Sequence, residues 1–211
     1  MQDIFVKICG ITTLHDALHA VRCKADAVGF IFSPEDPRCV TPETASDIIA
    51  RLPDYVSKVG VFRNADPRFV HDIVTRVKLS AVQLLGNEGP DDLVGFETSV
   101  IKAFRIHEQF DVEVMRNYIV DAFLLNALQP RKAGRRGRIY AWNIAIKAKN
   151  YGRVILSGGL TPENVEGAIR FVRPYGVDVC SGVETEPGMK DPAKVRDFIG
   201  SAKSLILEDT G

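Results

Sequence analysis

The stretch RVILSGGLTPENVEGAIRFV, residues 153–172, carries the signals of one βα unit. VILS is a continuous apolar run, which is typical of a strand buried on both faces, as in a parallel sheet. Two glycines provide a turn, and Thr161-Pro162 then places a capping residue before a proline at the first helical position. The stretch therefore predicts a strand, a glycine turn and a helix over 161–172.

The same succession recurs on both sides of this unit. Candidate strands lie at 4–9, 26–32, 57–62, 80–84, 99–105, 119–125, 153–157 and 176–180. Candidate helices lie at 13–23, 41–52, 66–77, 161–172 and 191–202. The segments after the fourth and fifth strands are short and poorly marked as helices.

Eight strands alternating with helices, with no linker between them, predict an α/β fold that is a single (β/α)8 TIM barrel. The alternative is a doubly wound open sheet, but no G-x-G-x-x-G motif follows the first strand. We expect one domain over 1–211, with the barrel core at about 4–203 and a loose tail at 204–211.

The composition limits the classes of partner that this chain is expected to bind. The 27 basic and 27 acidic side chains cancel, so no global field favours nucleic acid or an anionic membrane. The N-terminus resembles no signal peptide, and no 18-residue apolar run is present. Four scattered cysteines without a C-x-x-C pair favour reduced thiols in the cytoplasm.

Catalytic residues of a TIM barrel lie at the C-terminal ends of its strands. The first strand ends at Cys9, a candidate base or nucleophile, and Lys7 lies two residues earlier on the same face. The seventh and eighth strands end in glycine-rich turns, SGG at 157–159 and CSG at 180–182. Such turns leave backbone N–H groups open, so a phosphate site is expected there.

These segments, taken in order, resemble the phosphoribosylanthranilate isomerase family of tryptophan biosynthesis. The resemblance runs from about residue 5 to about residue 203. It rests on KICGIT (7–12), PRCV (37–40), KVGVF.N (58–64), SGGLTPENV (157–165) and DVCSGVE (178–184).

The resemblance implies an Amadori rearrangement of an aminoaldose phosphate to an aminoketose phosphate, without a cofactor or metal. Cys9 takes the place of the general base, and Arg38 that of an arginine that contacts substrate. Substrate-binding roles are expected for Lys7 and Asp178, the latter a strand-8 acid. The residues expected to bind the phosphate are Gly158, Gly159, Ser181 and Gly182. The expected partner is a small phosphorylated sugar, and the expected assembly is a monomer or homodimer.

The sixth strand departs from the family pattern FLLDA, whose Asp is the general acid, because this chain has FLLNA with Asn126. An amide has no proton to transfer near neutral pH, and losing a general acid typically costs ~10²–10⁴-fold in rate. Leu85 replaces the His of QLHG, Ala141 the Asp of FDW, and Cys180 a Ser or Asn before SGVE.

Three functions remain open: the family reaction with Cys9 as base, a related isomerase or lyase acting on another phosphorylated sugar, and a non-catalytic phosphosugar-binding protein. Two further features are interpreted as surface. RKAGRRGR at 131–138 is expected to be a solvated basic loop, with binding of a more anionic ligand as the alternative. His15 and His19 have metal-binding spacing, but their helix is expected outside the barrel.

Overall fold

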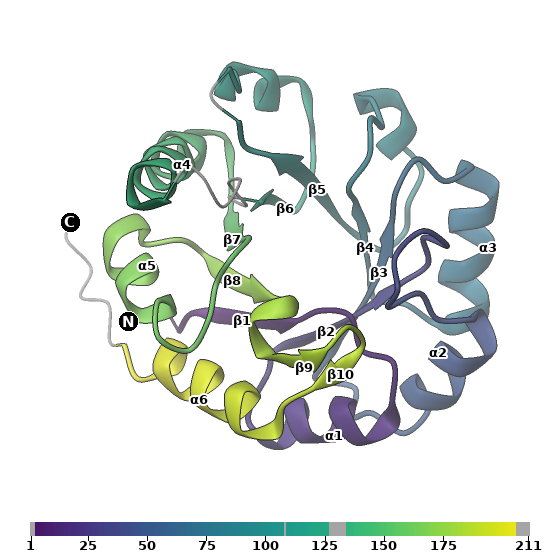
Figure 1. Ribbon diagram of the computed structural model, residues 1–211. Coiled ribbons are helices and arrows are strands. Elements are labelled where there is room, and N and C mark those ends of the chain that lie inside the picture. The colour runs from purple at the N-terminus through teal and green to yellow at the C-terminus, as the bar shows by residue number, and fades with distance from the viewer. Residues whose placement is uncertain (1–2, 108, 127–133, 206–211) are drawn as a thin grey trace.

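Eight parallel strands close into a barrel (Figure 1). The computed structural model describes residues 3–107, 109–126 and 134–205. The strands are β1 (Phe5–Ile8), β2 (Ala27–Ile31), β3 (Ser57–Phe62), β4 (Ala81–Leu84), β5 (Ser99–Arg105), β6 (Ala122–Asn126), β7 (Val154–Ser157) and β8 (Gly176–Val179). The barrel prediction is confirmed. The open sheet is wrong, because β8 pairs directly with β1.

Helices cover the outside of the barrel (Figure 1). They are α1 (Leu14–Arg22), α2 (Pro42–Ile49), α3 (Pro67–Val77), α4 (Gly134–Ala148), α5 (Val165–Val172) and α6 (Pro192–Lys203). Short 3-10 segments follow β4 and β5, as the weak helix signals there predict: η1 (Pro90–Leu93) and η2 (Val112–Asn117). Two more are η4 (Lys149–Tyr151) and η5 (Ser181–Val183), and a hairpin of β9 (Glu184–Glu186) and β10 (Met189–Lys190) follows η5. None of the helices in the described ranges is long and apolar enough to cross a membrane.

Three of the expected helices begin on a capping side chain followed by proline, the same signal that Thr161-Pro162 carries in the sequence. Thr41, Asp66 and Asp191 each accept a hydrogen bond from a backbone N–H of the first turn of α2, α3 and α6. These bonds satisfy donors that the helix itself leaves without a partner. Proline then fits the first helical position, where no backbone donor is needed.

The expected helix start at Thr161 is wrong, because α5 begins at Val165. The Asn164 side chain accepts a hydrogen bond from the Thr161 backbone N–H at 2.9 Å and donates one to the Gly159 carbonyl at 2.9 Å. This asparagine thus ties the start of the segment back to the glycine turn. Residues 162–164 form a turn instead of the first turn of the helix.

The prediction of a basic loop over 131–138 is wrong for its second half, since α4 begins at Gly134. Residues 131–133 lie outside the described residues. Of the tail expected at 204–211, residues 206–211 also lie outside the described part of the chain.

Alternate residues of each strand face the barrel interior or the helices, as the period of two requires. The interior cluster includes Ala27, Val59, Ala81, Ile101, Leu124 and Ile155. The outward faces join a larger core with the helices, including Phe30, Val82, Phe123 and Leu125. The same alternation holds at the strand ends, so the side chains of Cys9 and Asn126 face the barrel interior at its mouth.

A buried ion pair lies where the barrel closes. Lys7 of β1 and Asp178 of β8 are register partners, and the Lys7 ammonium is 2.7 Å from a carboxylate oxygen of Asp178. Their side chains are 0% and 6% exposed. Such a pair is costly to desolvate, but removing one partner costs more because the other charge stays buried.

Asp178→Ala is expected to lower the free energy of unfolding by about 3–5 kcal/mol, since it leaves a buried ammonium without a counter-charge. Urea denaturation followed by circular dichroism measures this loss. Glu166→Ala is the matched control, because it removes the partner of Arg170 in an exposed pair on α5, where the loss should stay below about 1 kcal/mol. Equal small losses in the two variants would contradict a closing role for the buried pair.

Candidate active site

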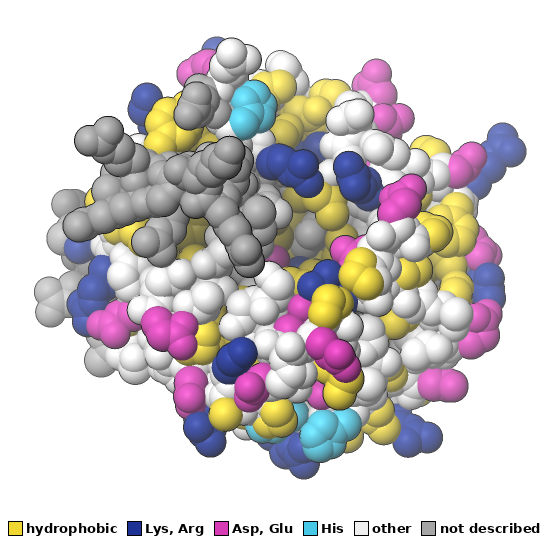
Figure 2. Space-filling view, viewed as in Figure 1, with side chains coloured by type: hydrophobic (Ala, Val, Ile, Leu, Met, Phe, Trp, Pro, Cys, Tyr) yellow, Lys and Arg dark blue, Asp and Glu magenta, His cyan; other side chains and the backbone are white. Residues whose placement is uncertain are grey.

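One row of polar side chains crosses five neighbouring strands at the C-terminal end of the barrel. Asn126 of β6 is the register partner of Arg105 on β5 and of Ser157 on β7. The Ser157 hydroxyl donates to Asp178 at 2.8 Å, and Asp178 pairs with Lys7 of β1. The strand-end side chains singled out in the sequence thus meet at one mouth, on the face shown in Figure 2, where a few Lys and Arg side chains lie beside the centre.

Asp178 has both carboxylate oxygens engaged, one by Lys7 and the other by Ser157. Burial lowers the pKa of Lys7, but Asp178 and the nearby Cys9 thiolate outweigh it, so the pKa stays above its ordinary value. Lys7 is therefore a fixed positive charge beneath the mouth. Asp178, predicted to bind substrate, serves in this geometry as its counter-charge, and each of its oxygens already accepts one hydrogen bond.

Cys9 and Cys180 form a thiol pair across β1 and β8. The Cys9 backbone N–H donates to the Val179 carbonyl at 2.8 Å, which extends the strand pairing as far as the two cysteines. A hydrogen bond from Cys180 lowers the pKa of Cys9 to about 7, with burial opposing it and Lys7 adding to it. The same hydrogen bond and burial raise the pKa of Cys180. Cys9 is thus the thiolate of the pair, and Cys180 keeps the proton.

Two glycines leave the space that these side chains occupy. A Cβ atom on Gly29 of β2 would lie 2.8 Å from the Cys9 sulfur and 3.2 Å from the Lys7 ammonium. A Cβ atom on Gly10 would lie 2.8 Å from the Cys180 sulfur and 2.7 Å from Cδ of Arg38. Real Cβ atoms do not approach so closely, and Gly10 also has a φ of +72°. Any side chain at either position would displace the thiol pair or its neighbours.

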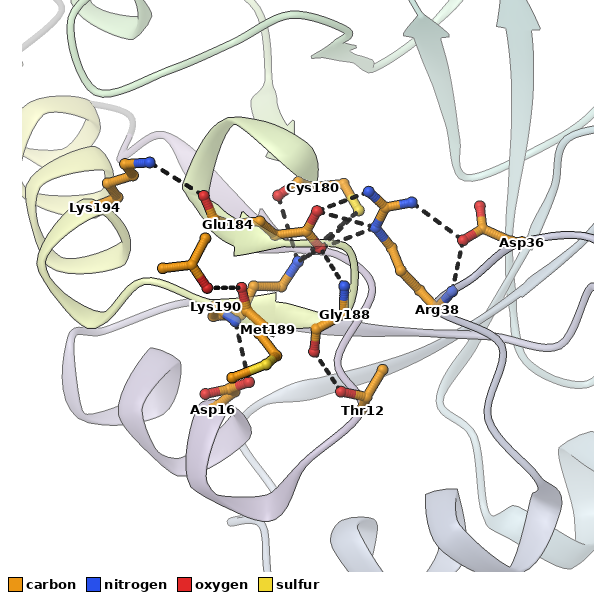
Figure 3. A network of polar contacts seen from close by, with 11 residues as sticks. Thr12, Asp16, Asp36, Arg38, Cys180, Glu184, Gly188, Met189, Lys190 and Lys194 are labelled. Carbon is orange, nitrogen blue, oxygen red and sulfur yellow. Dashed lines mark hydrogen bonds and ion pairs between the residues drawn. The ribbon is translucent and has the colours of Figure 1, made fainter.

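Arg38, in the loop after β2, lies in a network of charged contacts beside the thiols (Figure 3). Its Nε and Nη2 donate to Glu184 at 2.9 and 2.7 Å, and its Nη1 donates to Asp36 at 3.2 Å. Lys190 of β10 donates to the same Glu184 carboxylate at 2.8 Å. Burial raises the pKa of Glu184, but the hydrogen bonds from Arg38 and Lys190 hold it below its usual value. Nη1 and Nη2 each carry a second N–H that these contacts leave for a ligand.

The two glycine turns after β7 and β8 lie against each other. A Cβ atom on Gly182 would overlap the carbonyl oxygen of Leu160, so the turns are packed backbone to backbone. Gly158 and Gly159 have φ values of +91° and +67°, a region that side chains other than glycine rarely adopt. No described residue accepts a hydrogen bond from the backbone N–H of Gly158, Gly159, Ser181 or Gly182. The four predicted phosphate-binding residues therefore converge and present backbone donors.

The structure places every site residue predicted from the sequence at this mouth, but it adds three that the sequence did not reveal. Ser157, Glu184 and Lys190 hold Asp178 and Arg38 in place. Glu184 is the last residue of the SGVE motif, which was its only signal. Lys190 had no signal in the sequence, because the β9–β10 hairpin, and not the end of a barrel strand, brings it to the mouth.

The histidines of α1 lie away from the mouth. His19 Nε2 is 2.8 Å from the carbonyl oxygen of Pro192 and 3.5 Å from the Cys23 sulfur. Within the described ranges, no group of three or more His, Cys, Asp and Glu side chains could hold a metal ion.

A (β/α)8 barrel with a polar, thiol-bearing mouth at the C-terminal ends of its strands has the architecture of a TIM-barrel enzyme. Residues 6–201 match the model of the N-(5'-phosphoribosyl)anthranilate (PRA) isomerase family. The chain belongs to this family, as its sequence motifs predict. It is 52% identical to the N-(5'-phosphoribosyl)anthranilate isomerase of Geobacter sulfurreducens, over 94% of this chain and 98% of the relative.

Solved structures agree with this assignment. Phosphoribosyl anthranilate isomerase from Thermotoga maritima is similar with a TM-score of 0.86 and 42% identity, over 96% of this chain and 100% of the relative. A second crystal structure of such an isomerase holds reduced 1-(o-carboxyphenylamino)-1-deoxyribulose 5-phosphate. It matches with a TM-score of 0.84 and 40% identity, over 96% of this chain and 100% of the relative.

Alkylation of Cys9 by iodoacetamide is expected to rise with pH and to reach half of its plateau rate near pH 7, because the thiolate is the reactive form. Peptide mass spectrometry after short pulses at different pH values measures the rate. Cys39 is the internal control: burial raises the pKa of its thiol, so its rate should reach half of its plateau at a clearly higher pH than that of Cys9. Parallel pH profiles for the two thiols would contradict a poised Cys9.

Proposed function

We propose that this chain isomerises N-(5'-phosphoribosyl)anthranilate to its aminoketose phosphate by an Amadori rearrangement. One observation carries the proposal: the Cys9 thiol, with a lowered pKa and Lys7 beneath it, faces the mouth from which Asn126 and the glycine turns also project. The bound product-like ligand of the related crystal structure supports the same substrate class.

Cys9 is proposed as the base that removes the proton from C2 of the sugar. Opening of the ribose ring gives a protonated imine at C1, which makes the C2 proton acidic. The Cys9 thiolate takes this proton and leaves an enolamine, which becomes the ketose when its C2 hydroxyl loses a proton and C1 gains one. A pKa near 7 suits this task, because the group is charged at neutral pH and still accepts a proton.

Ring opening needs a proton on the ring oxygen, and Asn126 cannot transfer one. Asp178 does not provide it either, because Lys7 and Ser157 occupy both of its oxygens. We propose that a water molecule delivers the proton and that the Asn126 amide donates a hydrogen bond to the ring oxygen. The half-buried side chain lies at the end of β6, on the interior face of the mouth.

Substrate binding is proposed at two places. The phosphate lies on the open backbone N–H groups of Gly158, Gly159, Ser181 and Gly182, which anchor the sugar without a side-chain charge. The free N–H groups of Arg38, which Glu184 and Asp36 orient, bind the anionic anthranilate end. Fixing both ends holds C2 over Cys9 and reduces the entropy that the reaction must overcome.

The remaining partners follow from charge and from the relatives. We propose a monomer or homodimer, since one related structure contains monomers generated from a dimeric isomerase of Thermotoga maritima. The balance of 27 basic and 27 acidic residues supports a cytoplasmic enzyme without nucleic acid or membrane partners.

Cys9→Ala is expected to lower kcat for phosphoribosylanthranilate by about 10²–10⁴-fold with a smaller change in KM, because it removes the base and leaves the phosphate site. The fall in substrate fluorescence measures turnover. Cys39→Ala removes an exposed thiol to which no role in the reaction is assigned, and it should keep full activity. Tight binding of product by both variants, with no turnover by the unchanged protein, would instead favour a phosphosugar-binding protein.

Asn126→Asp is expected to raise kcat by about 10²-fold or more, since it introduces a proton donor where the ring oxygen is proposed to lie. The same fluorescence assay, run between pH 5 and 9, should show a new descending limb as the carboxylic acid ionises. An unchanged kcat would favour the second candidate function, an isomerase for a sugar phosphate that arrives in open-chain form. Asn126 is the observation behind that candidate, because such a substrate needs no ring-opening acid.

A further inference from the structure

Cys9 and Cys180 are placed as two halves of a disulfide. Residues 7 and 8 of β1 pair with residues 178 and 179 of β8, and the next pair in this register is Cys9 with Cys180. Neighbouring strands lie about 4.8 Å apart, within the range of ~4.4–6.8 Å between Cα atoms that a disulfide spans. Both side chains belong to the same interior cluster. The Cys9 backbone N–H donates to the Val179 carbonyl at 2.8 Å, so the two cysteines lie beside each other directly after the last strand pair, near enough for a disulfide.

The chemistry of the pair is divided between a reactive and a resolving thiol. Cys9 is the thiolate, because the neighbouring Cys180 thiol and the Lys7 ammonium lower its pKa. The Cys180 thiol keeps its proton and lies 3.9 Å from a carboxylate oxygen of Glu184, to which it donates. The Lys190 ammonium lies 3.9 Å from the Cys180 sulfur, where it stabilises a second thiolate once Cys9 has lost its charge. A thiolate beside a second thiol is the arrangement of a reversible redox site. Burial raises the pKa of the two remaining thiols, Cys23 and Cys39.

We propose that Cys9 and Cys180 are a modification site, oxidised by a peroxide to a reversible disulfide at the mouth of the barrel. The Cys9 thiolate attacks one oxygen of hydrogen peroxide, the O–O bond breaks, and Cys9 becomes a sulfenic acid as hydroxide leaves. The Cys180 sulfur then attacks the Cys9 sulfur and displaces its oxygen, while the Cys180 proton goes to the departing oxygen. In sum, two thiols and one peroxide give one disulfide and two water molecules.

The size of the oxidant matters, because Cys9 is only 5% exposed. Hydrogen peroxide is much smaller than the sugar phosphate that the mouth is proposed to admit, so it can reach the Cys9 sulfur. The disulfide also protects Cys9: a sulfenic acid that finds no partner goes on to the sulfinic acid, which a thiol reductant does not restore. The expected loss of turnover rests on the proposed function, since it assumes that Cys9 is the base. Bond formation itself does not.

The test treats the reduced, full-length protein with hydrogen peroxide, alkylates the remaining thiols and maps the peptides by mass spectrometry. We expect two of the four thiols to be lost together, and one cross-linked peptide pair to contain Cys9 and Cys180. Dithiothreitol should restore both thiols. Isomerase activity, if present, should fall and return in step with them.

Two variants complete the test, each compared with its own activity before peroxide. In Cys180→Ser, Cys9 should pass to the sulfinic acid, and dithiothreitol should not recover the lost thiol. Cys39→Ser should behave like the unchanged protein. Over-oxidation of Cys9 in the unchanged protein, or a cross-link between other cysteines, would overturn the proposal. A protein without isomerase activity that still forms the Cys9–Cys180 bond would refute the proposed function and leave this site standing.

Discussion

The buried charge of Lys7 is the constraint on which the mouth of this barrel depends. An ammonium with no exposed surface is tolerated only beside a counter-charge, and Asp178 on the closing strand provides it. Ser157 satisfies the other oxygen of that carboxylate, so three strands share one polar contact. The field of Lys7 also favours the Cys9 thiolate. Barrel closure and base activation thus use the same residue.

The mouth has two unlike halves. From β7 through β1 to the β9–β10 hairpin, polar atoms are held by short contacts, and the glycine turns present open backbone donors. On the side of β6, the register row ends in Asn126 and the exposed Arg105. The half that is proposed to bind phosphate and to remove a proton from carbon has all of the groups that this role needs. On the side of β6, where the reaction needs a proton donor, the chain has the amide of Asn126. Ring opening is therefore the step of the proposed reaction that Asn126 most affects.

The strands could be predicted from the sequence, because continuous apolar runs are a local signal. It could also be predicted that Lys7 and Cys9 lie on the same face of β1, because side chains alternate along a strand with a period of two. The start of α5 could not, since Asn164 forms a turn that competes with the Thr-Pro signal. Contacts between residues far apart in the sequence could not be predicted either. Arg38 meets Glu184 across 146 positions, and the cysteine pair is visible only once β8 is known to lie beside β1.

The β9–β10 hairpin shows how the separation of these residues along the sequence affects folding during synthesis. It lies late in the chain, yet it contacts the first βα loop through Thr12 and Gly188, and it supplies the lysine beside Glu184 (Figure 3). During synthesis, the segments around Cys9 and Arg38 leave the ribosome long before their partners exist. Contacts of such high sequence separation form slowly. Cys9, which becomes the most reactive thiol of the folded protein, therefore has no Cys180 partner until almost the last helix has been translated.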